Sequence, residues 1–420
     1  MNITFHHCTE VNRVVKMKGN FKIRKLVEED RESFKKLIRY AFDPSQNSYE
    51  NLGEYISDDP MDLFYGAFDG NLLVSGLGIH PYEIRMRSQD FKMLGIGWVA
   101  TKPEYRNRGI ARESMVKTFN YMYENQIPIS VLFPAKPSFY EKLGYKLVDE
   151  LVYYHFKTSD IKHQETDYRM VEVDSINDDI RSIYDKIIFK YDYIAKRPVI
   201  EYWRRHIKWN YKFICYNKNQ AVGYVIINFP SVSAFIGDDT WVEKPEKTIV
   251  IREAFWLDQT AKQTIFNFLW AHRDQREYIA GAFPVNEVII DLLITPRILE
   301  RKTIDNSLLR IIDVKSVLEN LTYSIDEFSI SIEIHDEFCP WNNGIFTLTS
   351  KNKIIRVEFN EKSEISADIE IDISYFAQLV AGFKTINDLL DFDFVSINYE
   401  HLGLLQKIFP RSNNFLSEYF

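Results

Sequence analysis

The stretch that decides the fold reads Arg106-Asn107-Arg108-Gly109-Ile110-Ala111-Arg112. It follows a predicted strand and opens a predicted helix over 109–123. Gly109 lets a ligand approach the backbone closely, and the N–H groups and dipole of a first helical turn suit a pyrophosphate. Arg108 and Arg112 stand where the helix dipole disfavours cations, and a bound anion would relieve that conflict. The alternative is a basic helix start that faces solvent.

The predicted strand before this loop, residues 92–101, contains two glycines near its end. Gly95 and Gly97 precede Trp98-Val99-Ala100-Thr101. Glycines inside a strand often mark a bulge or a close backbone approach. A splayed strand would expose N–H groups to a ligand amide, whereas the alternative is a packing kink.

The first block of the chain has the pattern of a mixed α/β sheet. Strands are expected at 21–26, 63–68, 72–79, 92–101, 129–133 and 145–156, and helices at 28–42, 49–56, 109–123 and 138–143. Asp69-Gly70-Asn71 is the expected turn of a hairpin. The chain then turns polar around 160–170, which indicates a domain boundary.

The middle block, to about residue 300, repeats part of this pattern. Strands are expected at 212–216, 221–229 and 278–283, with a helix at 260–270. Phe119-Asn120-Tyr121-Met122-Tyr123 resembles Phe266-Asn267-Phe268-Leu269-Trp270, and each is followed by a strand that ends in Phe-Pro. The similarity indicates either a second copy of the same fold or a chance likeness between two amphipathic helices.

The final block, from about residue 310, is a smaller α/β unit with an apolar end. Strands are expected at 323–334, 344–349, 354–359 and 366–371, and helices at 374–381, 386–390 and 400–409. The sequence ends Phe415-Leu416-Ser417-Glu418-Tyr419-Phe420. Because chain ends are normally polar and mobile, this apolar ending predicts a buried segment.

Composition and charge narrow the function classes. The 420 residues predict two or three domains. A net charge of -8 argues against general nucleic-acid binding, which needs a basic face, and suits a cationic substrate better. The three cysteines are far apart, without metal-ligand or redox spacing. No apolar run is long enough to span a bilayer. We therefore expect a cytoplasmic protein without nucleic-acid or membrane partners.

Arg106-x-x-Gly109-x-Ala111 resembles the acetyl-CoA pyrophosphate loop of the GNAT acetyltransferase superfamily. Ser138-Phe139-Tyr140-Glu141-Lys142-Leu143-Gly144-Tyr145 looks like a second segment of that superfamily, at the expected distance. The resemblance implies that Tyr140 is the general acid, whose phenol protonates the departing CoA thiolate. The alternative is that Tyr140 is a packed aromatic. The expected cofactor contacts are Val99, Ala100, Thr101, Asn107, Arg108, Gly109, Ile110, Ala111, Arg112, Ala135 and Lys136.

The order of the three blocks resembles the enhanced intracellular survival (Eis-type) acetyltransferases. The resemblance implies tandem GNAT-like mixed α/β sheets followed by a C-terminal sterol-carrier-protein-like α/β domain. The expected domains are 21–160, which is catalytic, 161–305 and 306–420. Leu308 to Val314 resembles the entry into the last domain. The middle copy lacks an Arg-x-x-Gly-x-Ala loop at Trp256 to Thr264 and is expected to be catalytically silent.

In that family the C-terminal carboxylate, here that of Phe420, reaches the active site and acts as base. The resemblance also implies a homo-hexamer and an amine acceptor, which in known members is an aminoglycoside. The expected substrate contacts are Asp43, Trp98 and Glu418. No metal is expected.

Two other functions stay open at this stage. A lipid-binding or carrier protein would use the final block, although that block carries no recognisable lipid motif. A regulator that binds CoA without turnover would not need Tyr140.

Overall fold

The computed structural model describes residues 19–42, 56, 59–203, 211–230, 235–236, 240–295, 300–361 and 367–418. The chain divides into two compact units, Met1–Ile79 with Gly97–Thr118, and His80–Ile96 with Phe119–Phe420. Strands β3 (Leu72–Met86) and β4 (Gln89–Thr101) and helix α3 (Ile110–Glu124) each contribute residues to both units. The units therefore divide the chain differently from the three blocks.

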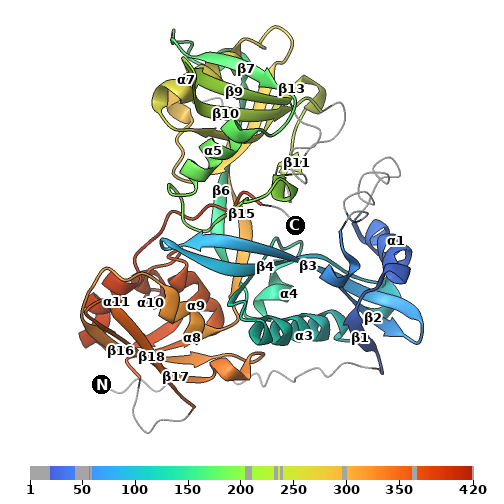
Figure 1. Ribbon diagram of the computed structural model, residues 1–420, viewed down its shortest axis with the longest axis vertical. Helices are drawn as coiled ribbons and strands as arrows, with labels where there is room; N and C mark the ends of the chain where they lie inside the picture. The colour runs from blue at the N-terminus through green and yellow to red at the C-terminus, as the bar shows by residue number, and fades with distance from the viewer. Residues whose placement is uncertain are drawn as a thin grey trace. The chain divides into compact units, whose positions relative to one another are not determined.

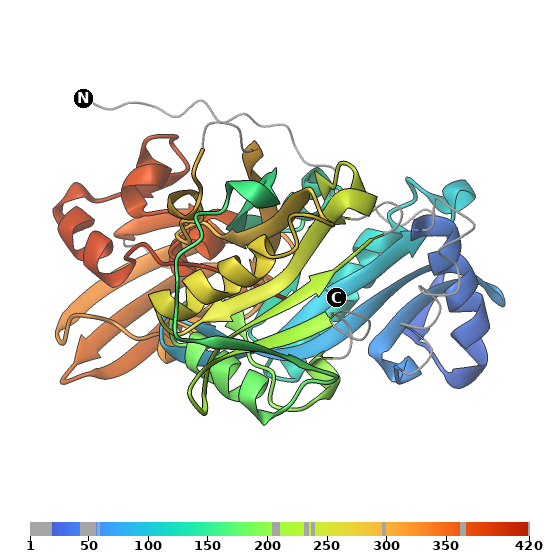
Figure 2. The ribbon, with the colours of Figure 1, turned by 90° about the horizontal axis from the view of Figure 1, so that it is seen from above.

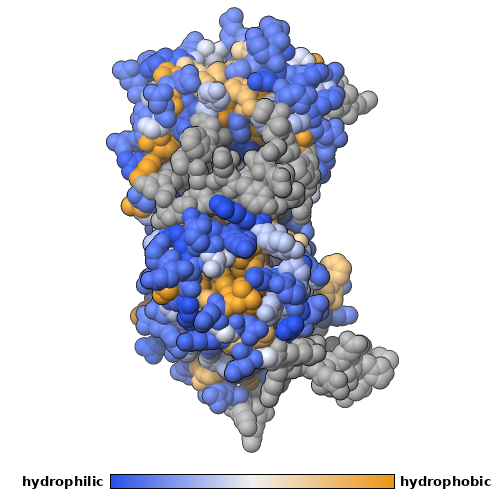
Figure 3. Space-filling view, turned by 90° about the vertical axis from the view of Figure 1, so that its right-hand side faces the viewer, coloured by the Kyte–Doolittle hydropathy of each residue, from blue (hydrophilic) through white to orange (hydrophobic). Residues whose placement is uncertain are grey.

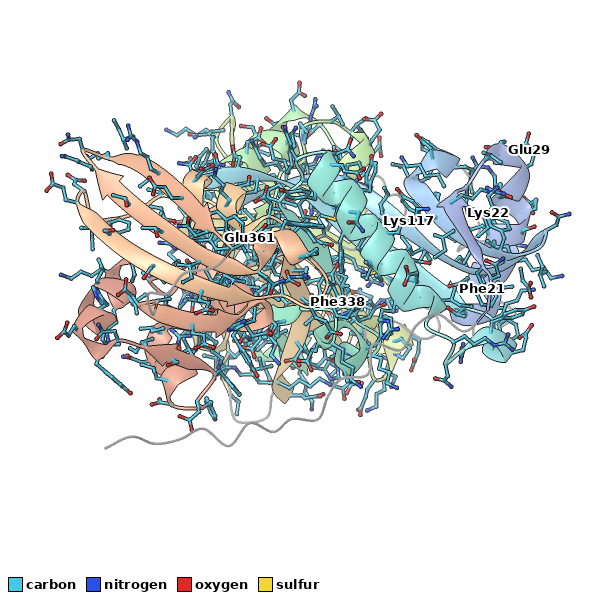
Figure 4. The ribbon with its side chains drawn as sticks, turned by 90° about the horizontal axis from the view of Figure 1, so that it is seen from below. Phe21, Lys22, Glu29, Lys117, Phe338 and Glu361 are labelled. Atoms are coloured by element: carbon cyan, nitrogen blue, oxygen red, sulfur yellow. The ribbon has the colours of Figure 1, made fainter. Side chains whose placement is uncertain are left out.

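The smaller unit is built on an antiparallel sheet. Strand β1 (Lys22–Lys25) pairs with β2 (Phe64–Asp69), and β2 pairs with the start of β3. Helix α1 (Arg31–Phe42) buries Phe34, Leu37 and Ile38 against this sheet. Lys117 of α3 lies beside β1 in Figure 4, and its ammonium donates a hydrogen bond to the Ile23 carbonyl at 2.7 Å.

The chain contains the same crossover twice. Strand β4 runs parallel to β5 (Ile129–Leu132), with α3 between them in the chain. Strand β13 (Thr248–Trp256) runs parallel to β14 (Tyr278–Pro284), with helix α7 (Gln259–Trp270) between them. The matching helices carry the two similar sequences, so the middle block repeats the fold of the first block.

In the middle block, two helices cover opposite faces of the sheet (Figures 1 and 2). Tyr224 and Ile226 of β10 pack with helix α5, whereas Val225 and Ile227 pack with α7. This alternation is the period of two expected for a strand buried on both faces. The remaining elements here are β7 (Arg169–Val173), α5 (Asp178–Ile187), β8 (Ile194–Ala195), β9 (Tyr211–Asn217), β10 (Gln220–Asn228), β11 (Phe235–Ile236) and β12 (Thr240–Trp241).

One long strand after the middle block closes the sheet of the first block. Strand β15 (Glu300–Ile311) lies between β5 and β6 (Lys146–Lys157), antiparallel to both. The expected boundary at 305/306 falls inside β15. Residues 308–311, expected at the entry to the final block, pair with β5 instead.

The final block is a five-stranded sheet in the order β18-β17-β16-β19-β20. Helix α9 is almost wholly buried, and Phe376, Leu379 and Val380 join the same core as Ile330 and Ile332 of β16. The elements are α8 (Val314–Asn320), β16 (Phe328–His335), β17 (Gly344–Lys351), β18 (Ile354–Asn360), β19 (Ile369–Asp372), α9 (Ile373–Val380), α10 (Ile386–Leu390), β20 (Val395–Ile397) and α11 (Leu402–Ile408).

The strands and helices expected from the pattern are present wherever the structure describes them, most within a few residues, including α4 (Pro137–Glu141). Two strands differ more, because β3 continues to Met86, seven residues beyond its expected end, and β16 begins at Phe328, five residues after its expected start. The exception is the helix expected at 49–56, of which only Ile56 lies in the described part. The elements that the pattern did not indicate are α5, α8, β7, β13, β15 and β20 and the short strands β8, β11 and β12.

The surface is mostly hydrophilic in the view of Figure 3, with hydrophobic residues gathered in limited patches. Among the described residues, no helix has both the length and the apolar character needed to cross a membrane.

A buried ion pair ties β15 to the final block. One guanidinium nitrogen of Arg310, Nη2, donates to both carboxylate oxygens of Asp336, at 2.6 and 2.8 Å. The two side chains are 0% and 1% exposed. Burial lowers the pKa of Arg310, but the charge of Asp336 outweighs it and the pKa is raised. A Cβ atom added to Gly144, whose φ is +82°, would lie 3.0 Å from the guanidinium carbon, so the pair also packs behind the end of α4.

Asp336→Ala is expected to destabilise the protein by about 3–5 kcal/mol, because it leaves the buried Arg310 cation without a counter-charge. Chemical denaturation monitored on the purified chain measures the loss. The double variant Arg310→Met/Asp336→Leu removes both charges and is the control. It should lose much less stability than the single variant, and an equal loss would contradict the account based on an uncompensated charge.

Candidate active site

Trp98 forms the irregularity that the glycines of β4 indicated. Its φ is +55°, in the left-handed region, although it lies inside a strand. A bulky residue held there costs of the order of 1–3 kcal/mol and indicates a constraint from the surroundings. The pairing of β4 with β5 ends at Ile96, two residues earlier. The half-buried Trp98 ring packs edge-on against Phe42, with 6.0 Å between ring centroids.

The end of β4 is held by polar contacts within the smaller unit. The Ser75 hydroxyl donates to the Ala100 carbonyl at 2.9 Å and lies 2.8 Å from the Thr101 hydroxyl. Lys102 N–H donates to the Val74 carbonyl at 2.9 Å. Ala100 is buried, whereas Val99 and Thr101 are half-buried. Residues 99–101 are therefore held in place directly after the left-handed Trp98.

The loop that follows has the backbone shape of an anion site. Asn107 and Gly109 both have left-handed φ values, +60° and +81°. The side chain of Arg106 donates to the Thr101 carbonyl at 3.1 Å, and that of Arg108 donates to the Glu104 carbonyl at 3.0 Å. Both contacts turn the arginines toward the loop's own backbone. Asn107 and Arg108 are exposed, so a ligand can reach the loop.

Helix α3 presents its first turn at this loop. Glu113 N–H donates to the Gly109 carbonyl at 3.0 Å, and the N–H groups before it belong to the turn that a helix leaves without internal acceptors. Ile110 is 2% exposed and packs with Phe21, Ala67 and Val74, which fixes the helix start. Ala111 and Arg112 are half-buried. These donors, with the charges of Arg108 and Arg112, fit a pyrophosphate.

Tyr140 belongs to the larger unit, on the short helix α4. Its ring packs edge-on against Phe139 at 4.9 Å and Tyr145 at 6.2 Å. Tyr145 is fully buried, and its hydroxyl lies 2.7 Å from that of Ser130. Burial raises the pKa of Tyr140 to about 12. The phenol is therefore protonated at neutral pH, as a general acid must be. Ala135 and Lys136, just before α4, are exposed.

Glu418, expected to bind the substrate, is placed differently. Its side chain is 0% exposed and forms an ion pair with Arg197, whose side chain is 2% exposed. A carboxylate held in this way is not an acidic group that faces an open pocket. Asp43 and Phe420, the two other acidic groups expected at the site, lie outside the described residues.

The sequence reasoning did not single out Arg197, Glu253 or Asp149. Glu253 accepts from Arg197 at 2.8 and 3.0 Å, and Asp149 is wholly buried between Asn306 and Leu416. A weak signal was available for Asp149 and Glu253, because each is a charged residue within a strand that is mostly apolar.

Three family matches follow the order of the blocks. Residues 22–148 and 195–311 each match an acetyltransferase (GNAT) domain, and residues 314–417 match a sterol carrier protein domain. The two GNAT domains identify the chain as an N-acetyltransferase. The resemblance expected from the loop and from the order of the blocks is confirmed, as is the class of fold.

Individual relatives agree with these domains. An uncharacterized N-acetyltransferase of Streptomyces avermitilis is 22% identical over 70% of this chain and 73% of its own length. A GCN5-related N-acetyltransferase from Anabaena variabilis has the same fold, with a TM-score of 0.82 at 22% identity over 96% of this chain and 100% of that one. Eis1 from Mycobacterium abscessus gives a TM-score of 0.74 at 16% identity, over the same shares of the two chains.

Among the described residues of this acetyltransferase, no group of three or more His, Cys, Asp or Glu side chains has the arrangement of a metal site. Cys215 and Cys339 are buried free thiols, and burial raises the pKa of each to about 12. Neither thiol has the low pKa of a nucleophilic cysteine.

Gly109→Glu is expected to weaken acetyl-CoA binding by at least about tenfold, because it places a negative charge and a side chain where the loop would meet a pyrophosphate. Isothermal titration of the variant with acetyl-CoA measures the change.

Gly70→Glu is the matched control for this test. Gly70 also has a left-handed φ, +57°, in the same unit, and open space surrounds it. The control carries a similar backbone strain and the same charge at a hairpin turn. Equal affinities for the two variants would place the cofactor elsewhere.

Proposed function

We propose that this N-acetyltransferase moves an acetyl group from acetyl-CoA to a primary amine. The observation that carries the proposal is the loop at the start of α3, where Asn107 and Gly109 adopt left-handed conformations beside Arg108 and Arg112. Nest-like backbone of this kind binds phosphate groups. The left-handed Trp98 supports the second part of the site, because it lies between Ile96, where the pairing of β4 with β5 ends, and residues 99–101.

In the proposed reaction, a neutral amine attacks the thioester carbonyl. The backbone N–H near Val99 polarises that carbonyl, as in an oxyanion hole. A C–N bond forms, the C–S bond breaks, and Tyr140 gives its proton to the thiolate. The pKa of the Tyr140 phenol is about 12, whereas that of a thiol in water is about 8.5. Proton transfer from this phenol to a solvated thiolate would therefore be unfavourable. The same apolar surroundings would also raise the pKa of the CoA thiol, so the difference between the two pKa values becomes smaller.

The base in this proposal is the C-terminal carboxylate of Phe420, which receives or relays the amine proton. Support comes from the residues before it, since Asn414, Phe415 and Leu416 are buried. The Leu416 N–H donates to Asp149 of β6 at 3.1 Å, and β6 begins directly after Tyr145, the ring neighbour of Tyr140. The chain is therefore fixed close to its end, on the strand that follows the proposed acid.

For the acceptor we propose a cationic amine, an aminoglycoside or another polyamine. The net charge of -8 favours such a substrate, and Trp98 offers an aromatic face to a cation. The assembly proposed with it, from the Eis-type resemblance, is a homo-hexamer. A lipid-carrier function is less well supported, because α9 fills the apolar side of the C-terminal sheet with Phe376, Leu379 and Val380.

Thiol release from acetyl-CoA, assayed with aminoglycosides, polyamines and lysyl peptides, tests this function. Acceptor-dependent release is expected with at least one cationic amine. Tyr140→Phe should lower kcat by about 10²–10⁴, the usual contribution of a general acid, and should leave acetyl-CoA affinity nearly unchanged.

Phe139→Leu is the control for a change in packing at this position. The Phe139 ring packs against Tyr140 but carries no proton that could be transferred. If Tyr140→Phe keeps full turnover while chemistry limits the rate, Tyr140 is only a packing residue. Release of thiol with none of the amines would contradict the proposed activity itself.

Extension of the chain by a short tag after Phe420, or deletion of Phe420, should cut turnover sharply while acetyl-CoA binding is largely retained. Both changes move the carboxylate, and the positioning of a base is a large part of its contribution to rate. The same tag placed before Met1 should be harmless. Full activity in the C-terminally extended protein would show that another group is the base.

A further inference from the structure

The segment Asn413–Glu418, called here the C-terminal segment, is irregular but mostly buried. Its backbone is bonded to residue 192 of the middle block, because Phe415 N–H donates to the Asp192 carbonyl at 2.9 Å and Asp192 N–H donates to the Asn413 carbonyl at 3.0 Å. Asn414 makes an isolated parallel bridge with Asp192. Buried backbone without regular structure persists only where its polar groups find such partners.

Polar side chains of β6 and β15 hold Leu416. Its N–H donates to Asp149 at 3.1 Å, and its carbonyl accepts from Asn306 of β15 at 3.0 Å. The Asn414 amide donates to the carbonyls of Val148 and Ala381, at 2.8 and 3.0 Å. Burial raises the pKa of Asp149 to about 7, although the hydrogen bonds from Asn306 and Leu416 oppose part of this effect. Because each side of the Leu416 peptide has its own partner, the segment cannot slide along the chain direction.

Arg197 of the middle block holds the next two residues. Its guanidinium is ion-paired with Glu418 and donates to the Ser417 hydroxyl at 3.1 Å. It also donates to both oxygens of Glu253, at 3.0 and 2.8 Å. Burial lowers the pKa of Arg197, but the charges of Glu253 and Glu418 outweigh it and raise the pKa well above its usual value. One buried cation thus links a strand of the middle block to the C-terminal segment.

Aromatic rings enclose this cation. The Arg197 guanidinium lies 4.2 Å from the ring centre of Tyr184 and 4.5 Å from that of Trp203, both of which are fully buried. The Tyr184 hydroxyl also lies 3.3 Å from that of Ser417, and Tyr224 donates to Glu253 at 2.7 Å. A guanidinium packed between rings has few rotamers available, so it offers Glu418 one position.

The contacts fall on a particular part of the middle GNAT domain. Glu253 and Phe255 lie on β13 beyond Ile251, the last residue of β13 that pairs with β14. The Phe415 ring packs edge-on against Phe255, with 6.0 Å between centroids, and against Tyr191 at 5.2 Å. In the first GNAT domain the matching stretch of β4, beyond Ile96, carries Trp98 and Val99. The middle block therefore uses the corresponding stretch of β13 to bind its own chain.

We propose that the middle GNAT domain is a clamp for the C-terminal segment, in which Arg197 and Glu253 are positioning residues for the terminal carboxylate. This inference rests on the proposed function, in which that carboxylate is the base. It gives the domain without a Gly-loop a role in the reaction, through the chain that it holds. Glu418 then serves as the anchor of the segment and not as a substrate contact.

Arg197→Gln, Glu253→Gln and Glu418→Gln in the full chain test the clamp. Hydrogen exchange at the amides of Phe415 and Leu416 reports release of the segment, and steady-state kinetics report its effect. We expect exchange to accelerate by at least about tenfold, because removing one partner from a buried ion pair favours local opening. We expect kcat to fall by at least about tenfold, and KM for acetyl-CoA to stay within about twofold.

Asp258→Ala is the matched control. Asp258 caps α7 of the same domain by accepting from the Ala261 N–H at 2.7 Å, and its loss should destabilise that helix. This change lowers the stability of the domain without touching the segment, so exchange at Phe415 and kcat should not change. Should Arg197→Gln fail to fold, Glu418→Gln, which leaves the Arg197–Glu253 pair intact, carries the test.

Unchanged exchange at Phe415 and Leu416 in the folded variants would overturn the clamp. Faster exchange with unchanged kcat would overturn the positioning role. The chain extended after Phe420 then distinguishes failure of the clamp proposal from failure of the base assignment. If the extension abolishes turnover, the carboxylate is the base and only the clamp is wrong, whereas an active extended chain contradicts the base assignment itself.

Discussion

The insertion of β15 between β5 and β6 is the constraint on which the larger unit depends. Through this pairing, residues that follow the middle block complete the sheet of the first block. The same strand carries Arg310, which is paired with Asp336 of the final block, and Asn306, which binds the Leu416 carbonyl. A slip of β15 by one residue would turn both side chains to the opposite face of the sheet. Its register therefore fixes the ion pair and the C-terminal segment together.

Backbone N–H groups and buried charged side chains have different roles in this protein. The loop at residues 107–112, the proposed cofactor site, presents backbone N–H groups that are held by the fold and would cost no side-chain ordering on binding a phosphate. The groups around Arg197 are charged side chains removed from water, which are stable only while every partner is present. The first arrangement suits a ligand that enters and leaves at each turnover. The second suits a segment of chain that stays in place.

Local sequence predicted those parts of the fold that local physics decides. Asp69-Gly70-Asn71 predicted the hairpin of β2 and β3, and the loop at Arg106–Arg112 predicted the start of α3. The sequence pattern did not predict α5, although a helical signal was present. After the cap residue Asn177, the buried positions have helical spacing: Ile180, Ile183, Tyr184 and Ile187. Its short length and the charged residues between the apolar positions made the period weak.

Long-range partners could not be predicted in the same way. The polar first half of β15 gives little strand signal, because its stability comes from β6, about 150 residues earlier in the chain. Glu418 is a residue type that is usually exposed, and its ion pair with Arg197, 221 residues away in the chain, could not be predicted from local sequence. The roles of Asp43 and Phe420 rest on the sequence and on the proposed chemistry alone.

This separation has a consequence for biosynthesis. Arg197 and Glu253 leave the ribosome long before Glu418, and at about 5–20 residues per second the 221 residues between Arg197 and Glu418 take roughly 10–45 seconds to make. During that time Glu418 is not yet available to Arg197, and Phe415 is not yet available to the rings of Phe255 and Tyr191. The contacts between the middle domain and the C-terminal segment can therefore form only after residues 413–418 have been synthesised.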